Sequence, residues 1–220
     1  MRIKINISVK VGRVVKYLVL SDLFLLFGWG FIEPVLSVFI VERIAGATLV
    51  TVGIATALYW ILKSVLQLPV ANWLDRDRTQ GEKHDFAALA GGLLIAGFSA
   101  LAFSIVTRPW ELYLVQAIHA VAFALYIPSW SSIFSRHLDH DRVSFDWSLD
   151  STVSGVAAGI SGLLAGVMAA SLGFVAVFVA GGIFSLLAAF IIIAFPDIVM
   201  PKAADVGIQM KDKTPTAAGI

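Results

Sequence analysis

Four ionisable side chains lie inside segments of the sequence that are otherwise apolar. Asp22 and Glu33 lie in the run 17–41, Lys63 lies in the run 48–70, and His119 lies in the run 112–134. A charge that faces lipid at mid-depth costs at least about 2.5 to 3.5 kcal/mol, so we expect these side chains to face protein or water. Such groups can form ion pairs and can bind and release protons, and the imidazole of His119 can do so near neutral pH.

Polar residues recur at helical spacing in the same three runs. The first stripe comprises Asp22, Trp29 and Glu33, the second Thr56, Tyr59, Lys63 and Gln67, and the third Gln116, His119, Tyr126 and Trp130. At about 100° per residue, the members of each stripe return to one face of a helix. Three helices with one polar face each predict a shared aqueous cavity that serves as a substrate or ion pathway.

Several of these side chains have two interpretations. Asp22 and Lys63 lie at comparable depths, which predicts an ion pair that either takes part in gating or ion coupling or only orients two helices. His119 either transfers a proton or makes an interhelical hydrogen bond. Glu33 either lines the pathway or is a solvated acid at its rim, and Trp130 is interpreted as a packing residue.

The elements that must position these residues are six apolar runs. They cover residues 17–41, 48–70, 86–106, 112–134, 153–172 and 174–195. Each can cross a bilayer, since about 20 residues span the hydrocarbon core. A chain with 59% hydrophobic and 14% charged residues has too little polar surface for a water-soluble domain. We therefore predict an all-α polytopic membrane protein with six transmembrane helices.

The composition also excludes several kinds of site and partner. The chain has no cysteine, which rules out disulfides, a thiolate nucleophile and cysteine-based metal sites. Its four histidines do not cluster at the spacing of metal ligands, so we predict no metal, no cofactor and no catalytic residue. The formal net charge of +1 indicates no nucleic-acid partner.

The distribution of Lys and Arg predicts the orientation in the membrane. Of the 16 Lys and Arg residues, all except Arg43, Lys63 and Arg108 fall in the segments on one side of the bilayer. Cytoplasmic loops carry an excess of such residues, so both termini should be cytoplasmic. We expect an integral protein of a bacterial or archaeal plasma membrane, with a basic N-terminal segment (1–16), a six-helix domain (17–195) and a polar, disordered tail (196–220).

The fifth apolar run carries a stripe of glycines. It comprises Gly155, Gly159, Gly162 and Gly166. Small residues at this spacing allow close approach by another helix, so we predict a packing role. The letters around Ser161 also match the serine motif of intramembrane rhomboid proteases, but that enzyme needs a histidine on a later helix, and no histidine follows His140. An intramembrane enzyme is therefore not favoured.

The chain resembles the N-terminal half of a major facilitator superfamily transporter over about residues 17–195. The segment that begins Leu74-Asp75-Arg76-Asp77-Arg78 is similar to the family pattern G-x-x-x-D-R-x-G-R, with Asp75 and Arg76 matching its core. Ala71 and Arg78 stand where that pattern has glycine. Pro128 fits the distal proline of the family's fourth helix, and the glycine stripe is similar to a fifth-helix motif in which Ile160 replaces a proline.

The resemblance implies two three-helix repeats and a cavity lined by the first and fourth helices. It places Asp22, Trp29, Glu33, Gln116, His119 and Tyr126 in that cavity, and it assigns cytoplasmic gating to Asp75, Arg76 and Arg78. Family transporters usually have two six-helix halves, so this chain would pair with a second copy of itself or with a separate second half. Asp75 would then approach the start of the partner's fifth helix, near residues 150–153.

These observations predict a half-size secondary transporter that moves a small solute by alternating access. No P-loop is present, so the energy would come from gradients, and proton coupling through Asp22, Glu33 or His119 is one hypothesis. The main alternative is a non-transporting assembly partner, or a truncated and inactive half, in which the same charges only hold helices together.

Overall fold

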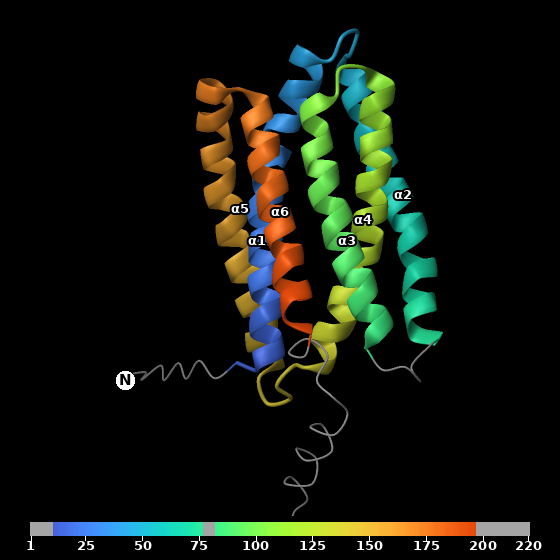
Figure 1. Cartoon of the computed structure of the whole chain (residues 1–220), viewed down its shortest axis with the longest axis vertical. Helices are drawn as coiled ribbons and strands as arrows, with labels where there is room; N and C mark the ends of the chain where they lie inside the picture. The colour runs from blue at the N-terminus through green and yellow to red at the C-terminus, as the bar shows by residue number, and fades with distance from the viewer. Residues whose placement is uncertain (1–10, 77–81, 197–220) are drawn as a thin grey trace, which may run out of the picture.

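The computed structural model describes residues 11–76 and 82–196, and this part of the chain is a bundle of membrane-length helices (Figure 1). The six long helices are α1 (Arg13–Arg43), α2 (Leu49–Arg76), α3 (Lys83–Ala102), α4 (Pro109–Arg136), α5 (Val143–Leu172) and α6 (Phe174–Ala194), and a short 3-10 turn, η2 (Phe103–Ile105), continues α3. All six are long and apolar enough to cross a membrane. The prediction of an all-α protein with six spans is confirmed.

The helices pack in a pattern that repeats after three. Helix α1 packs against α5 and α6, α4 packs against α2 and α3, and α3 packs against α6. Advancing every helix by three, so that α1 becomes α4 and α4 becomes α1, reproduces the same contacts. The fold is therefore built from two three-helix repeats, as predicted. In Figure 1, α5 and α2 flank the bundle, with α6 and α3 in front of α1 and α4.

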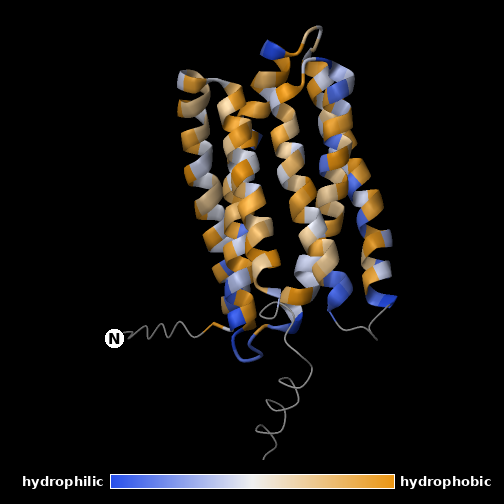
Figure 2. Cartoon of the chain, viewed as in Figure 1, coloured by the Kyte–Doolittle hydropathy of each residue, from blue (hydrophilic) through white to orange (hydrophobic). Residues whose placement is uncertain are grey.

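Hydropathy along the bundle fits a membrane position. Hydrophobic residues cover the length of the helices, and hydrophilic residues gather at their ends (Figure 2). The starts of α1, α3 and α5 lie at the same end of the bundle as the last turns of α2, α4 and α6 (Figure 1). We call this the basic end, because Arg13, Arg76, Lys83, Arg136 and Arg142 lie there.

Two polar connections are shorter than the sequence indicated. Helix α2 continues through Asp75 to Arg76, so these residues lie in its last turn and not in a connection. Helix α5 begins at Val143, ten residues before the expected apolar run, and its first turns hold Asp146 and Asp150. A helix of 30 residues is about 45 Å long, which exceeds the hydrocarbon core, so its polar first turns can extend beyond that core.

Small residues bring α1 and α4 close to their neighbours. A Cβ atom at Gly30 of α1 would lie 2.9 Å from the Cα of Ala158 on α5, and one at Gly92 of α3 would lie 2.8 Å from the carbonyl oxygen of Ala122 on α4. A Cβ at Gly28 of α1 would likewise meet the Gly181 carbonyl of α6 at 2.6 Å. These backbones approach too closely for any larger residue.

The glycine stripe of α5 does not make such contacts within the described residues. A Cβ at Gly155, Gly159 or Gly166 would meet no atom within 4 Å, and one at Gly162 would make only ordinary contact with the Gly30 carbonyl. Helices α5 and α2 are also the two least buried of the six spans. The packing role predicted for this stripe stays a prediction.

Candidate functional site

Three rings from three helices stack at the centre of the bundle. The ring of Trp29 on α1 lies on the imidazole of His119 on α4, with centroids 3.7 Å apart and planes 3° from parallel. The other face of that imidazole lies on Tyr59 of α2, at 4.3 Å and 19°. Phe123, one turn along α4, meets the imidazole edge-on at 4.9 Å. We call Trp29, Tyr59, His119 and Phe123 the ring cluster.

The ring cluster lies at mid-depth in the membrane. Trp29 is next to the middle residue of the 31-residue α1, which places it roughly 20 Å from either helix end. Tyr59 and His119 each lie ten residues from the start of their helix, or about 15 Å at 1.5 Å per residue. Mid-depth is where transporters with inverted repeats bind their solutes.

Two nitrogen atoms of the ring cluster have no hydrogen-bond partner in the described part of the chain. They are Nε1 of Trp29 and Nε2 of His119, both buried. The other imidazole nitrogen, Nδ1, lies 3.4 Å from Oε1 of Gln116. A buried polar group without a partner costs about 1 to 3 kcal/mol, so the cluster is chemically incomplete as it stands.

Lys63 lies beside the ring cluster and pairs with rings instead of a carboxylate. Its Nζ atom is 3.7 Å from the centroid of Trp60 and 5.3 Å from that of Tyr59. Side chains on a helix tilt toward its N-terminus, which brings Lys63 back over residues three and four positions earlier. A cation over a ring gains roughly 0.5 to 2 kcal/mol, and only Trp60 is close. This gain offsets only part of the cost of a charge at mid-depth, which is at least about 2.5 to 3.5 kcal/mol.

The ion pair expected between Asp22 and Lys63 is not formed. Asp22 instead accepts a short hydrogen bond from the Tyr126 hydroxyl of α4 and a 2.7 Å hydrogen bond from the Ser154 hydroxyl of α5. One turn before Ser154, Oδ1 of Asp150 is buried without a described partner. Asp22 thus joins α1, α4 and α5 between the ring cluster and the basic end.

The remaining predicted pathway residues differ in their surroundings. Glu33 is exposed on α1, which fits either of its two interpretations. Trp130 stacks on Phe134 with centroids 4.5 Å apart, which supports its interpretation as a packing residue. Ser161, the residue of the protease-like motif, donates a hydrogen bond to the carbonyl of Ala157 within its own helix.

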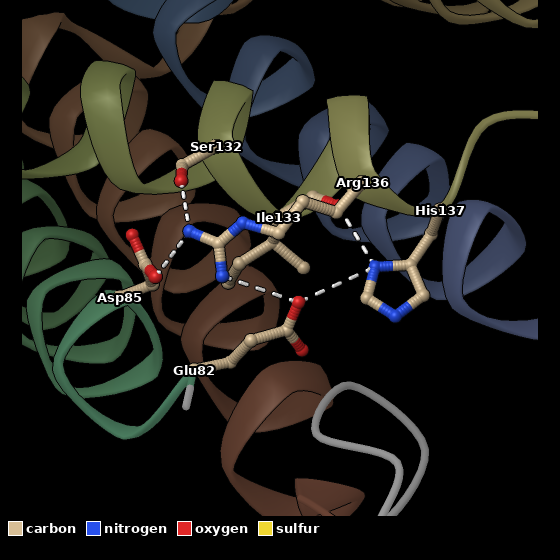
Figure 3. Close-up of polar contacts among 6 residues, drawn as sticks. All are labelled: Glu82, Asp85, Ser132, Ile133, Arg136 and His137. Atoms are coloured by element: carbon tan, nitrogen blue, oxygen red, sulfur yellow. Dashed lines mark hydrogen bonds and ion pairs between the residues drawn. The ribbon is translucent and has the colours of Figure 1, made fainter. Parts of the chain in front are cut away.

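A second polar cluster joins α3 to α4 at the basic end (Figure 3). One guanidinium nitrogen of Arg136 lies 2.6 Å from Oδ2 of Asp85, and the other lies 3.3 Å from Oε1 of Glu82. Arg136 also donates a short hydrogen bond to Ser132. Nδ1 of His137 lies 3.7 Å from the same Glu82 oxygen. Burial raises the pKa of Glu82, and the positive groups of His137 and Arg136 oppose this rise only in part.

This cluster was not predicted from the sequence. The sequence feature that could have indicated it is a pair of acids, Glu82 and Asp85, just before the apolar run 86–106, together with Arg136 just after the run 112–134. Of the three residues predicted to take part in gating, Asp75 and Arg76 lie in the last turn of α2, and Arg78 lies outside the described residues. Their gating role stays a prediction. Among the described residues, no group of three or more His, Asp or Glu could hold a metal ion.

Six membrane-length helices in two repeats, around the ring cluster at mid-depth, define a polytopic helical membrane protein. A profile of the Major Facilitator Superfamily matches residues 18–217, so the chain belongs to that superfamily. The superfamily consists of membrane transporters and not enzymes, which fits the expectation that the chain is not an enzyme. A search of curated proteins finds no match.

Proposed function

We propose that this chain is a half-size secondary transporter that moves a small solute by alternating access. The observation that carries the proposal is the ring cluster, in which three helices place two unpartnered nitrogen atoms at mid-depth. A solute that accepts a hydrogen bond from Nε1 of Trp29 would complete it. Rocking of one helix bundle against another would then open the site to each side in turn.

The second bundle is proposed to be another copy of the same chain. Helices α2 and α5 are the least buried spans, and three glycines of α5 face no described atom. Both described ends lie at the basic end, so two parallel copies can pair about a twofold axis. The excess of Lys and Arg supports a cytoplasmic basic end, in a bacterial or archaeal plasma membrane. A separately encoded second half is the alternative partner.

Proton coupling is proposed for Asp22, with Glu33 and His119 as further candidates. The carboxylate of Asp22 is buried and bonded to two hydroxyl groups, and none of the described ion pairs includes it. Such a carboxylate can take up a proton without breaking an ion pair. Helix motion that separates Tyr126 or Ser154 from Asp22 would then change how strongly that proton is held.

Solute counterflow into liposomes that contain the purified full chain tests this function. The solutes tested should include small acids, amines and neutral amides. Trp29→Phe keeps an aromatic ring but removes the N–H donor, so we expect counterflow to fall roughly tenfold to a hundredfold. Asp22→Asn should leave counterflow intact but abolish uptake driven by a pH gradient.

The matched control is Trp110→Phe, because Trp110 is exposed at the end of α4 opposite the basic end. It should transport like the wild type. Equal counterflow in the Trp29 and Trp110 variants would contradict the assignment of the ring cluster. Absence of flux for every solute, in a folded protein, would favour the non-transporting assembly partner or inactive half.

A further inference from the structure

Lys63 is a buried cation without a carboxylate partner in the described chain. Its side chain is 8% exposed, and its Nζ lies over the ring of Trp60 at 3.7 Å and over that of Tyr59 at 5.3 Å. The two acids of the polar face of α1 form no ion pair with it, since Asp22 is bonded to two hydroxyl groups and Glu33 is in none of the described ion pairs. A positive charge in these surroundings would be stabilised by an anion, and none of the described ion pairs supplies one.

The depth of Lys63 argues against a lipid headgroup as that anion. The residue lies at the middle of the 28-residue α2, which is roughly 20 Å from either helix end. The hydrocarbon core extends only about 15 Å on each side of its midplane. A lysine so close to the midplane lies beyond the distance over which its side chain reaches the interface.

The neighbours of Lys63 specify the rest of the ligand. Trp60 is 55% exposed and lies edge-to-face with Tyr59 at 5.3 Å, so the rings form an apolar wall next to the ammonium. Trp29, at the far side of the stack, offers an N–H donor and no acceptor. A cation and a donor beside an aromatic wall match a molecule with an anionic group and a flat or apolar body.

We propose that the ring cluster and Lys63 bind an amphipathic organic anion, with its carboxylate on Lys63 and its apolar body against the rings. This deepens the proposed transport function and rests on it for its physiological meaning. Lys63 then acts as the charge filter of the pathway, because it attracts anions and repels cations of the same size.

The test measures binding of matched probes to the full chain in phosphatidylcholine nanodiscs. The probes are benzoate and phenylacetate, their neutral amides, and benzylamine as the cation. Tryptophan fluorescence and the thermal unfolding midpoint report binding, since Trp29 and Trp60 lie at the site. We expect both carboxylates to bind at least about tenfold more tightly than their amides, and the amine not to bind.

Three variants assign the effect to Lys63. Lys63→Met should weaken carboxylate binding at least about tenfold and remove the preference over the amide, whereas Lys63→Arg should retain that preference. Lys16→Met removes the same charge from an exposed position near the basic end and should bind like the wild type. Equal binding of acids and amides, or carboxylate binding unchanged in Lys63→Met, would overturn the proposal.

Two further arms separate rival outcomes. If phosphatidylglycerol in the nanodisc, and not the soluble acids, stabilises the wild type over Lys63→Met, the occupant is a lipid and the proposal is wrong. Counterflow in liposomes separates binding from transport. Binding that depends on Lys63 without any flux would leave the anion site standing and reject the transport function. Transport of neutral or cationic solutes at the same rate in the wild type and in Lys63→Met would support the transport function and reject the anion site.

Discussion

At the scale of single residues, Arg136 holds the start of α3 to the end of α4. It bonds to Asp85, Glu82 and Ser132 while its own side chain stays 41% exposed. The two acids are far more buried than the arginine, so they depend on it for a counter-charge. The cluster therefore joins the start of α3, in the first repeat, to the end of α4, in the second.

Stability should depend on pH through Glu82. Burial raises the pKa of Glu82 above its ordinary value of 4.5, so the folded protein holds this proton more tightly than the unfolded chain does. The free energy of unfolding should therefore fall as the pH rises above 4.5 through the raised pKa. Glu82→Gln is neutral at every pH and should remove this fall, with stability at neutral pH equal to the wild type or up to about 1 kcal/mol higher.

Thermal unfolding in detergent between about pH 4.5 and pH 8 checks this, with Asp85→Asn as the matched variant. Asp85 makes the shorter contact with Arg136, so its loss should lower stability by roughly 1 kcal/mol at neutral pH. If Glu82→Gln keeps the full pH dependence, the dependence arises elsewhere in the protein.

At the scale of helices, the close approach of α1 to α5 depends on Gly30. A Cβ at this position would overlap the Ser161 side chain and the Ala158 backbone. Gly30→Ala should therefore lower stability by about 1 to 3 kcal/mol. Gly53→Ala on α2, where a Cβ meets nothing within 4 Å, should be neutral or up to about 1 kcal/mol more stable, because alanine favours the helix. Thermal unfolding midpoints compare the two. A Gly30→Ala protein as stable as the wild type would show that α1 and α5 are farther apart than described.

The existence and number of the helices could be predicted from sequence, but not where their polar ends lie. Twenty consecutive apolar residues have one stable form in a bilayer, which is a helix. Beyond the hydrocarbon core this constraint ends, and the sequence from Val143 to Asp150 is as compatible with a connection as with the first turns of α5. Local contacts decide there, such as the 3.1 Å hydrogen bond from the Asp139 backbone to the Asp146 carboxylate.

The faces of the helices were likewise predictable, but their pairings were not. The helical spacing placed Trp29, Tyr59 and His119 on the polar faces of their helices, and these three rings stack on one another in the structure. Spacing alone does not show which neighbour a face meets, so Asp22 was assigned to Lys63 on α2 when it bonds to Tyr126 and Ser154. The charge of Lys63 suggested a carboxylate partner, and its folding back onto Trp60 depends on side-chain geometry that the spacing does not contain.

At the scale of the whole molecule, the six-helix bundle is symmetric within itself yet leaves two helices largely uncovered. In each repeat the first helix is central, and α2 and α5 occupy equivalent outer positions. Both carry large exposed apolar residues, among them Ile61 and Leu68 on α2 and Leu163 and Val167 on α5. Lipid can cover such surfaces, but the open glycines of α5 offer the close backbone approach that helix pairs use in membranes.

Dimerisation through α5 is the prediction that decides whether one bundle serves as half of a transporter. Native mass spectrometry of the chain released from nanodiscs should show a dimer that persists on dilution. Gly159→Leu adds a large side chain where the described chain has open space, so it should leave the fold intact but block close approach and shift the particle toward monomer. Gly91→Leu, also in open space but on α3, should stay dimeric.

The outcomes separate three arrangements of the bundle. A wild-type monomer at every dilution would point to a separate second half, whereas a dimer that Gly159→Leu leaves unchanged would place the interface away from the glycines of α5. A wild-type dimer that Gly159→Leu converts to a monomer, together with loss of counterflow in Gly159→Leu, would show that two copies of this bundle form the working transporter.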